Sequence, residues 1–203
     1  MQRRGDDLRE RILSAAKDVF LEHGFERASM DVIAARADTT KRTLYAHFEN
    51  KEKLFVAIIE YTRGLLSARL KFPADYGDDP EHALVQFCAR FLDTMIRDRS
   101  IQMCRLTLAE AAQFPDAAAR FHDAMFGTVH DRLATYLSER RGAARTAATR
   151  DAGDLLARIM YPRFTRVLFG VDPAAEWHDD DASTHVDLKP IRAAVAETLR
   201  ASR

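Results

Sequence analysis

The sequence predicts an all-α protein of about nine helices, in which a group of short helices precedes a longer helical part. Apolar residues recur at spacings of three and four along almost the whole chain, as they do in amphipathic helices, and no segment alternates as a strand does. Capping residues such as Ser29, Thr40 and Asp79 stand directly before several of these runs. The 203 residues, 47% apolar and 31% charged, suffice for one large core or two unequal modules.

Two helices are predicted within the first 37 residues. The apolar stripe of the first consists of Leu8, Ile12, Ala15, Val19 and Phe20. Gly24 follows it and suits the left-handed residue that ends a helix. Ser29 can cap a short second helix through its hydroxyl. We expect the apolar side of that helix to hold Val32, Ile33 and Ala37.

Two further helices follow closely. Thr40 can cap a third, short helix whose buried edge is formed by Leu44 and Phe48, four residues apart. Asn50 can cap a fourth helix, which runs to about Leu70. Four helices within 70 residues, the middle two short and close together, are typical of a helix-turn-helix arrangement.

The outer face of the third helix is polar and cationic, as a helix in the major groove of DNA must be. The N-terminal residues of such a helix read base edges, so positions 40 to 43 are the predicted base readers. Tyr45 and His47 can donate to phosphates, and Lys51 adds a cation at a helix N-terminus, which favours anions. For the charges alone, a solvated surface is the alternative interpretation. The predicted DNA contacts are Ser29, Thr39, Thr40, Lys41, Arg42, Thr43, Tyr45, His47 and Lys51.

The run "ERASMDVIAARADTTKRTLYAHFENKEKLFVAII" resembles the DNA-binding domain of the TetR family of transcriptional regulators, and the resemblance covers residues 8 to 62. The residues in register are Leu44, Tyr45, Phe48, Lys51, Glu52 and Leu54. The resemblance implies a helix-turn-helix DNA-binding domain over residues 1–53. A fourth helix from about residue 51 would link it to a helical ligand-binding and dimerisation domain over residues 54–203.

Four positions depart from the family pattern. The usual turn glycine and its apolar successor are replaced by Asp38 and Thr39, and aspartate tolerates the left-handed conformation better than most residues. Arg42 stands where glycine is frequent, and His47 replaces an aromatic residue. Because arginine pairs with a guanine edge, we expect an operator preference that differs from that of relatives.

The second half begins after a connection that contains Pro73, Gly77 and Pro80. Asp79 can cap the next helix. Ser100 can cap the helix after that one, which we expect to end at Pro115. We expect a long helix from about Asp116 to Arg141 closed by Gly142, and then a flexible or poorly packed link with the sequence "GAARTAATRDAG". The last two long helices are expected over residues 154–169, bent or interrupted at Pro162, and over residues 188–201.

This half resembles the ligand-binding and dimerisation half of a TetR-family subset that includes regulators of efflux. The resemblance implies a small-molecule pocket, for which soft apolar side chains and a few polar ones are available. Ordinary core packing is the alternative for each apolar residue, and solvent exposure for each polar one. The predicted ligand contacts are Phe87, Phe91, Met95, Met103, Arg105, Phe121, His122, Met125 and Tyr161.

The resemblance also implies a homodimer that forms through the last two long helices. A single short recognition helix buries too little surface to select one site in a genome, which favours a dimer independently. Two copies related by a two-fold axis would read an inverted repeat with half-sites roughly 34 Å apart or a multiple of that distance. The predicted function is a repressor released by a small hydrophobic or amphipathic ligand. The alternatives are a regulator controlled by a protein partner or without an inducer, and a helical small-molecule-binding protein that does not bind DNA.

Composition and motifs argue against other classes. No apolar run reaches the ~20 residues of a membrane span and no secretory signal opens the chain, so we expect a cytoplasmic protein. The chain has only two cysteines, Cys88 and Cys104, which excludes a disulfide framework. Both lie on apolar helical faces, so we expect buried, inert thiols rather than a redox sensor. No catalytic motif is present, so we predict no enzyme activity and no cofactor. The stretch from His178 to His185 has metal-ligand types, but solvated acidic residues are the favoured interpretation.

Overall fold

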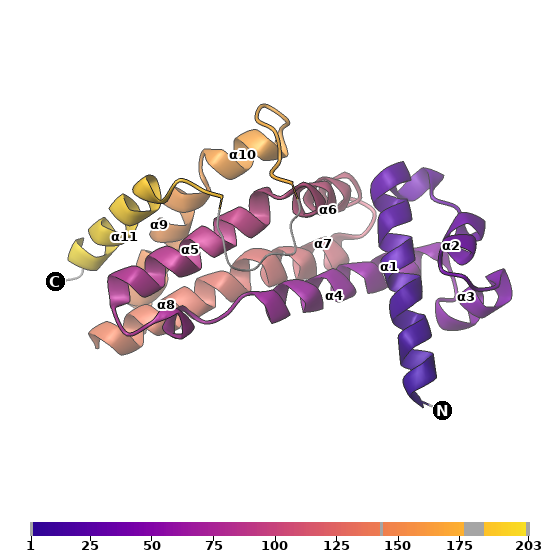
Figure 1. Ribbon diagram of the computed structural model, residues 1–203, viewed down its shortest axis with the longest axis horizontal. Coiled ribbons are helices and arrows are strands. Elements are labelled where there is room, and N and C mark those ends of the chain that lie inside the picture. The colour runs from indigo at the N-terminus through magenta and orange to yellow at the C-terminus, as the bar shows by residue number, and fades with distance from the viewer. Residues whose placement is uncertain (1, 143, 177–184, 202–203) are drawn as a thin grey trace. The chain divides into compact units, whose positions relative to one another are not determined.

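The computed structural model describes residues 2–142, 144–176 and 185–201. Within these ranges the chain forms eleven α-helices, one 3-10 helix and one π-helical segment, with no strand (Figure 1). The all-α prediction is confirmed. The two α-helices beyond the predicted nine arise because the chain breaks between α7 and α8 and, at Pro162, between α9 and α10. None of the described helices is long and apolar enough to cross a membrane.

The chain divides into two compact units. The first contains residues 1–65 and 105–122, and the second contains residues 66–104 and 123–203. The helices at the start of the chain are α1 (Gln2–Arg27), α2 (Met30–Arg36), α3 (Lys41–His47) and α4 (Lys51–Arg69). Helix α4 therefore begins in the first unit and ends in the second.

Aromatic rings form the centre of the first unit. Gly24 has φ 75°, which is the predicted left-handed break near the end of α1, and Phe25 directly after it is buried. The rings of Phe20, Phe25 and Phe55 have centroids 5.2 to 5.8 Å apart. Phe114 lies 5.0 Å from both Phe25 and Phe55. Each such pair stabilises the fold by ~0.5–1.5 kcal/mol beyond the burial of its area.

The three predicted caps of the first unit are confirmed. Ser29 Oγ accepts a hydrogen bond from the Asp31 N–H at 3.2 Å. Thr40 Oγ1 accepts from the Thr43 N–H at 3.1 Å, and Asn50 Oδ1 from the Lys53 N–H at 2.8 Å. Each side chain thus satisfies one of the N–H groups that lack a partner in the first turn of a helix.

The predicted apolar side of α2 is wrong at one residue. Val32 is 43% exposed, whereas Ile33 and Ala37 are buried as expected. Residues along a helix are rotated by about 100° each, so Val32 and Ile33 cannot both lie at the centre of the same face. The buried face instead follows the spacing of three and four, with Met30, Ile33, Ala34 and Ala37.

The remaining elements are η1 (Pro73–Tyr76), α5 (Pro80–Ile96), α6 (Asp98–Ala109), α7 (Pro115–His122), the π-helical segment η2 (Asp123–Gly127), α8 (Thr128–Arg141), α9 (Arg145–Met160), α10 (Arg163–Leu168) and α11 (Leu188–Ala201). Asp79 caps α5 by accepting from the His82 N–H at 2.8 Å, as predicted. Gly142 closes α8 with φ 60°, also as predicted. The Ser100 cap is wrong, because α5 ends at the extended Arg97 and α6 has already begun at Asp98.

The flexible link expected over residues 142–153 is also wrong, since α9 begins at Arg145. Ala148 and Ala152, four residues apart, are buried, and His130 Nε2 of α8 lies 2.9 Å from the Thr149 carbonyl. A Cβ added at Gly153 would lie 3.6 Å from the same histidine ring. The small residues that suggested a link instead allow α9 to pack closely against α8.

Candidate nucleic-acid interface

The turn between α2 and α3 is built around Asp38. Its φ of 50° is in the left-handed region that glycine usually occupies. The Asp38 N–H donates to Ala35 O at 3.2 Å, and the Thr39 N–H donates to Ala34 O at 3.0 Å. These bonds close the end of α2, so the turn forms with aspartate in the position where glycine is common.

Helix α3 is held by two apolar residues and presents a polar face. Leu44 and Phe48 are buried, as predicted. Lys41, Arg42 and His47 are exposed, and Tyr45 is 40% exposed. Thr43 is half-buried, and its hydroxyl lies 2.9 Å from that of Thr40.

The two cations of α3 differ in their surroundings. Lys41 Nζ lies 2.9 Å from Asp31 Oδ1 on α2. This hydrogen bond, with the charge of the carboxylate, raises the pKa of Lys41. Arg42 has no hydrogen-bond or ion-pair partner in the part of the chain that the structure describes. Its guanidinium can therefore bind an external acceptor without breaking an internal bond.

Lys51 has a role that the sequence did not suggest. Its ammonium donates to Phe25 O at 2.9 Å and to Glu26 O at 3.0 Å, with Ala28 O at 3.5 Å. The same nitrogen lies 4.5 Å from the centroid of the Phe25 ring. Carbonyl groups at the end of a helix lack helical partners and favour a cation. The ammonium thus ties the start of α4 to the end of α1, which argues against the phosphate contact expected of it.

Arg9 is a candidate contact that the sequence did not reveal. It is exposed on α1, and its guanidinium carbon lies 5.3 Å from the centroid of the Phe48 ring at the end of α3. A guanidinium stacked on a ring keeps N–H groups free to donate at its edge. No local pattern could have identified it, because the two residues are 39 positions apart in the sequence.

An ion pair joins α1 to α2 on the surface of the same unit. Arg36 donates to both carboxylate oxygens of Glu22, at 2.6 and 2.8 Å. This hydrogen bonding lowers the pKa of Glu22 and raises the pKa of Arg36. The paired geometry fixes the orientation of α2, which precedes the turn at Asp38.

The predicted ligand contacts fall into two groups. Six apolar residues are buried, with exposures between 0 and 5%: Phe87, Phe91, Met95, Met103, Phe121 and Met125. Burial is what core packing predicts for them. Arg105 and His122 are exposed, and Tyr161 is 70% exposed, so these three do not lie in the interior. Tyr161 follows the end of α9, where the chain turns at Pro162.

Both cysteines are buried, as expected. Burial raises the pKa of Cys104 to about 12 and raises that of Cys88 still further. Because the thiolate is the reactive form, neither residue has the character of a redox sensor near neutral pH.

A groove of about 350 Å³ lies in the second unit beside Tyr161. Its apolar lining includes four side chains that are almost fully buried: Leu92, Ile96, Ile159 and Ile191. Arg158, Arg163 and His185 also line it. An apolar hollow with a few polar groups at its edge is the usual form of a small-molecule site.

A buried ion pair is hydrogen-bonded to the backbone of His185, one of the residues that line this groove. Arg97 donates to Asp93 Oδ2 at 2.6 Å, and both side chains are buried. Asp93 Oδ1 accepts from the backbone N–H of His185 at 3.2 Å. The other metal-ligand types noted near His185, at residues 178–181, lie outside the described residues. Among those described, no group of three or more potential metal-binding side chains occurs.

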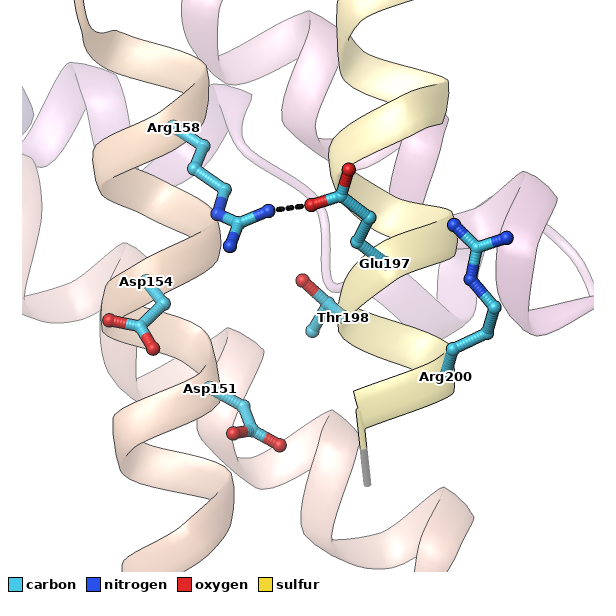
Figure 2. Close-up of a pocket in the computed structure, with 6 residues that line it drawn as sticks. All are labelled: Asp151, Asp154, Arg158, Glu197, Thr198 and Arg200. Atoms are coloured by element: carbon cyan, nitrogen blue, oxygen red, sulfur yellow. Dashed lines mark hydrogen bonds and ion pairs between the residues drawn. The ribbon is translucent and has the colours of Figure 1, made fainter. Parts of the chain in front are cut away.

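Helices α9 and α11 carry a polar hollow (Figure 2). Residues 154–160 of α9 and all of α11 belong to the two segments predicted to form the dimer. Arg158 on α9 and Glu197 on α11 point toward one another and form an ion pair. The remaining lining residues are Asp151, Asp154, Thr198 and Arg200. Charged residues are depleted at the centres of protein interfaces, so this part of the two helices fits the rim of an interface better than its centre.

Comparison with known proteins identifies relatives for both parts of the chain. Residues 12–58 match the bacterial regulatory proteins of the tetR family, and residues 82–189 match the C-terminal domain of AefR-like transcriptional repressors. The HTH-type transcriptional repressor BepR of Brucella suis is 30% identical over 166 residues, covering 75% of this chain and 77% of BepR. The HTH-type transcriptional repressor NicS of Pseudomonas putida is 34% identical over 93 residues, covering 45% of this chain and 43% of NicS.

Solved structures have the same fold. A TetR-family regulator from Mesorhizobium loti superimposes with a TM-score of 0.80 at 20% identity, covering 98% of each chain. The flavonoid-responsive regulator FrrA superimposes with a TM-score of 0.74 at 26% identity, covering 97% of each chain.

Proposed function

Because the chain belongs to the TetR family of transcriptional regulators, we propose that it is a homodimeric repressor whose helix α3 reads an inverted-repeat operator. Binding of a small molecule would release the repressor from this operator. The observation that best supports DNA reading is the exposed first turn of α3, in which Arg42 has no partner among the described residues. Such a regulator would act on chromosomal DNA, so the cytoplasm is its proposed location.

The DNA contacts divide into two kinds. Arg42 and Thr43, with Thr40 and Lys41, form the first turn of α3 and its cap, and would face base edges. A bidentate contact from Arg42 to guanine would contribute ~1–3 kcal/mol of discrimination. Phosphate contacts would come from residues around that turn and at the end of α3: Arg9, Ser29, Thr39, Tyr45 and His47. Lys51 would act by positioning, since its ammonium binds the end of α1.

The dimer would form through the two segments predicted for it, namely residues 154–169, which contain the end of α9 and α10, and residues 188–201, which form α11. A dimer with two recognition helices is needed because the seven-residue helix α3 alone buries too little surface to select a specific DNA site. With two-fold symmetry, the half-sites of the operator would lie roughly 34 Å apart or a multiple of that distance.

The effector would be a planar phenol or acid bound in the groove beside Tyr161. FrrA, a relative by fold and at 26% identity, is named as flavonoid-responsive. The groove combines an apolar lining with a tyrosine ring and arginines, which suits a flat molecule with an anionic or phenolic edge. A flavonol and a naphthoate, titrated against the protein–operator complex, test this class. If neither lowers operator affinity nor binds the free protein, this class of effector is wrong.

A second candidate is a regulator that has no small-molecule inducer or responds to a protein. It is favoured by the tight burial of Phe87, Phe91, Met95 and Met125, since a ligand among them would have to displace packed side chains. Mass spectrometry of the protein purified under native conditions separates the candidates. A stoichiometric bound compound supports the first, and its absence together with no effect of candidate ligands supports the second.

The test of DNA binding is an anisotropy titration with labelled duplex from the region upstream of the protein's own gene. We expect binding that prefers this duplex over random sequence and weakens as salt rises, with a slope of ~0.9 in log K per neutralised phosphate. A titration without sequence preference and without salt dependence would exclude the proposed function.

A further inference from the structure

Arg158 on α9 lies between two hollows of the second unit. It lines the apolar groove beside Tyr161 and also the polar hollow of Figure 2, and among the described residues it is the one that the two linings share. In Figure 2 its guanidinium points toward Glu197 on α11, with which it forms an ion pair. The same guanidinium can therefore bind either this internal carboxylate or a ligand in the groove.

Arg163 and Asp187 also line the groove, but both are held by internal bonds. Arg163 donates to Asp172 Oδ2 at 2.9 Å, and Arg166 donates to both oxygens of the same carboxylate at 2.8 and 3.0 Å. Hydrogen bonding from Arg166, and then from Arg163, lowers the pKa of Asp172. Asp187 stands directly before α11, and its Oδ1 accepts from the Lys189 N–H at 2.9 Å. Arg163 thus belongs to a cluster of three charges, and Asp187 caps a helix.

The pair of Arg158 and Glu197 is easier to exchange. Both side chains are 54% exposed, whereas the side chain of Asp172 is 22% exposed. An exposed ion pair contributes little to stability because water solvates both of its charges. Glu197 can therefore leave Arg158 without becoming a buried, unpaired charge. A ligand carboxylate in its place would keep the planar two-point pairing that a guanidinium makes with a carboxylate.

The groove suits a ligand that has an apolar body and one carboxylate. Its volume of about 350 Å³ is near the lower end of the ~300–1,000 Å³ usual for ligand pockets, which favours a small molecule. The four buried apolar side chains of its lining can contact the body of such a ligand, and Arg158 can bind its carboxylate. A phenol has a pKa of about 10 and is uncharged near neutral pH, so it does not replace the charge of Glu197.

We propose that the groove beside Tyr161 binds a small aromatic monocarboxylate, which displaces Glu197 from Arg158. This rests on the proposed function, in which the groove is the effector site, and it selects the acid over the phenol named there. Arg158 binds the ligand carboxylate. Glu197 competes for the same guanidinium, and so it sets the concentration of acid to which the site responds.

The test is calorimetric titration of the whole chain with three probes that share one ring system: 2-naphthoate, 2-naphthamide and 2-naphthol. For the wild-type protein, we expect naphthoate to bind about tenfold more tightly than the two uncharged probes, as a charge-assisted hydrogen bond predicts. Arg158→Gln should weaken naphthoate binding by about 20-fold for the same reason, and change naphthamide binding by less than about twofold. Glu197→Gln should strengthen naphthoate binding by about threefold, the effect of removing an exposed ion pair, and leave naphthamide binding unchanged.

Arg200→Gln is the matched control, since Arg200 lines the polar hollow but not the groove. It should keep the wild-type affinity for naphthoate. The inference is overturned if naphthoate does not bind, if an uncharged probe binds as tightly, or if Glu197→Gln fails to strengthen naphthoate binding.

If Arg158→Gln does not fold, Arg158→Lys decides, because lysine keeps the charge without the planar pairing. A partial loss of naphthoate affinity then supports the exchange, and an unchanged affinity refutes it. Release of the operator is measured separately by anisotropy. Naphthoate that binds with the expected dependence on Arg158 and Glu197 but leaves the operator bound would support the exchange and count against the proposed effector role.

Discussion

Replacing Lys51 by methionine separates a structural role from a DNA contact, because the substitution keeps the aliphatic chain and removes the ammonium. Two hydrogen bonds at 2.9 and 3.0 Å are lost, together with the contact to the Phe25 ring. A hydrogen bond to a charged group contributes ~1.5–3 kcal/mol when buried, and a cation over a ring ~0.5–1 kcal/mol. Because Lys51 is only half-buried, we expect a total loss of about 2 kcal/mol.

The assay compares urea unfolding, followed by circular dichroism, with the salt dependence of operator binding. With a slope of about 2 kcal/mol per molar urea, a loss of about 2 kcal/mol lowers the unfolding midpoint by about 1 M. The salt slope should stay the same, because no phosphate contact is removed. Lys53→Met is the matched control: Lys53 pairs with Glu49 at 2.5 Å on the surface, and the loss of this pair should cost about 0.3–0.5 kcal/mol.

The opposite result would refute the positioning role of Lys51. If its ammonium contacts a phosphate in each half-site, the salt slope of the variant falls by about 0.9 for each protomer. A reduced slope combined with an unchanged unfolding midpoint would show that the ammonium leaves the end of α1 to bind DNA.

Three further predictions concern side chains of the first unit. Arg42→Gln should change base preference at one position of each half-site, as measured by selection from randomised duplexes, whereas Tyr45→Phe, which removes a proposed phosphate donor, should weaken binding to all sequences alike. Asp31→Asn removes the carboxylate that holds Lys41, so random-sequence duplex should bind more tightly, by about 0.2–1 kcal/mol for an exposed pair, and an unchanged affinity would contradict this. The hydrogen bond from Arg36 lowers the native pKa of Glu22, so its stabilisation is present above the ordinary carboxyl value of 4.5 and is lost as pH falls toward the native pKa; Glu22→Gln should flatten that part of the stability curve measured by urea unfolding.

The reading helices could be predicted from sequence because their determinants are local. A cap residue and its N–H partner are two or three positions apart, so Ser29, Thr40 and Asn50 could be identified without knowledge of the tertiary structure. The turn could be predicted for the same reason, since the left-handed conformation is a property of Asp38 itself. The buried pair Leu44 and Phe48 followed from the spacing of four.

Properties that depend on distant partners could not be predicted. Whether Lys51 faces DNA or the end of α1 depends on residues 23 to 26 positions away. The start of α9 resembled a link because alanine and glycine are common in flexible segments, and only the neighbouring α8 gives them a packing role. The prediction that Tyr161 lies in the interior was wrong, because the helix breaks at Pro162 and Tyr161 follows the end of α9.

In the first unit, the residues that stabilise the fold differ from those proposed to select the DNA sequence. Leu44, Phe48 and Lys51 hold α3 and α4 through internal contacts, so changes there alter the fold before they alter the choice of sequence. Arg42 makes no internal bond that its replacement would break, within the described residues, so that position can change with little effect on stability. A regulator of this construction can acquire a new operator by substitution at Arg42 and its neighbours on the surface of α3, while the helices beneath remain as they are. Selection on the operator would therefore act on the positions where this chain departs from the family pattern, and Arg42 is the one among them that we propose pairs with a base edge.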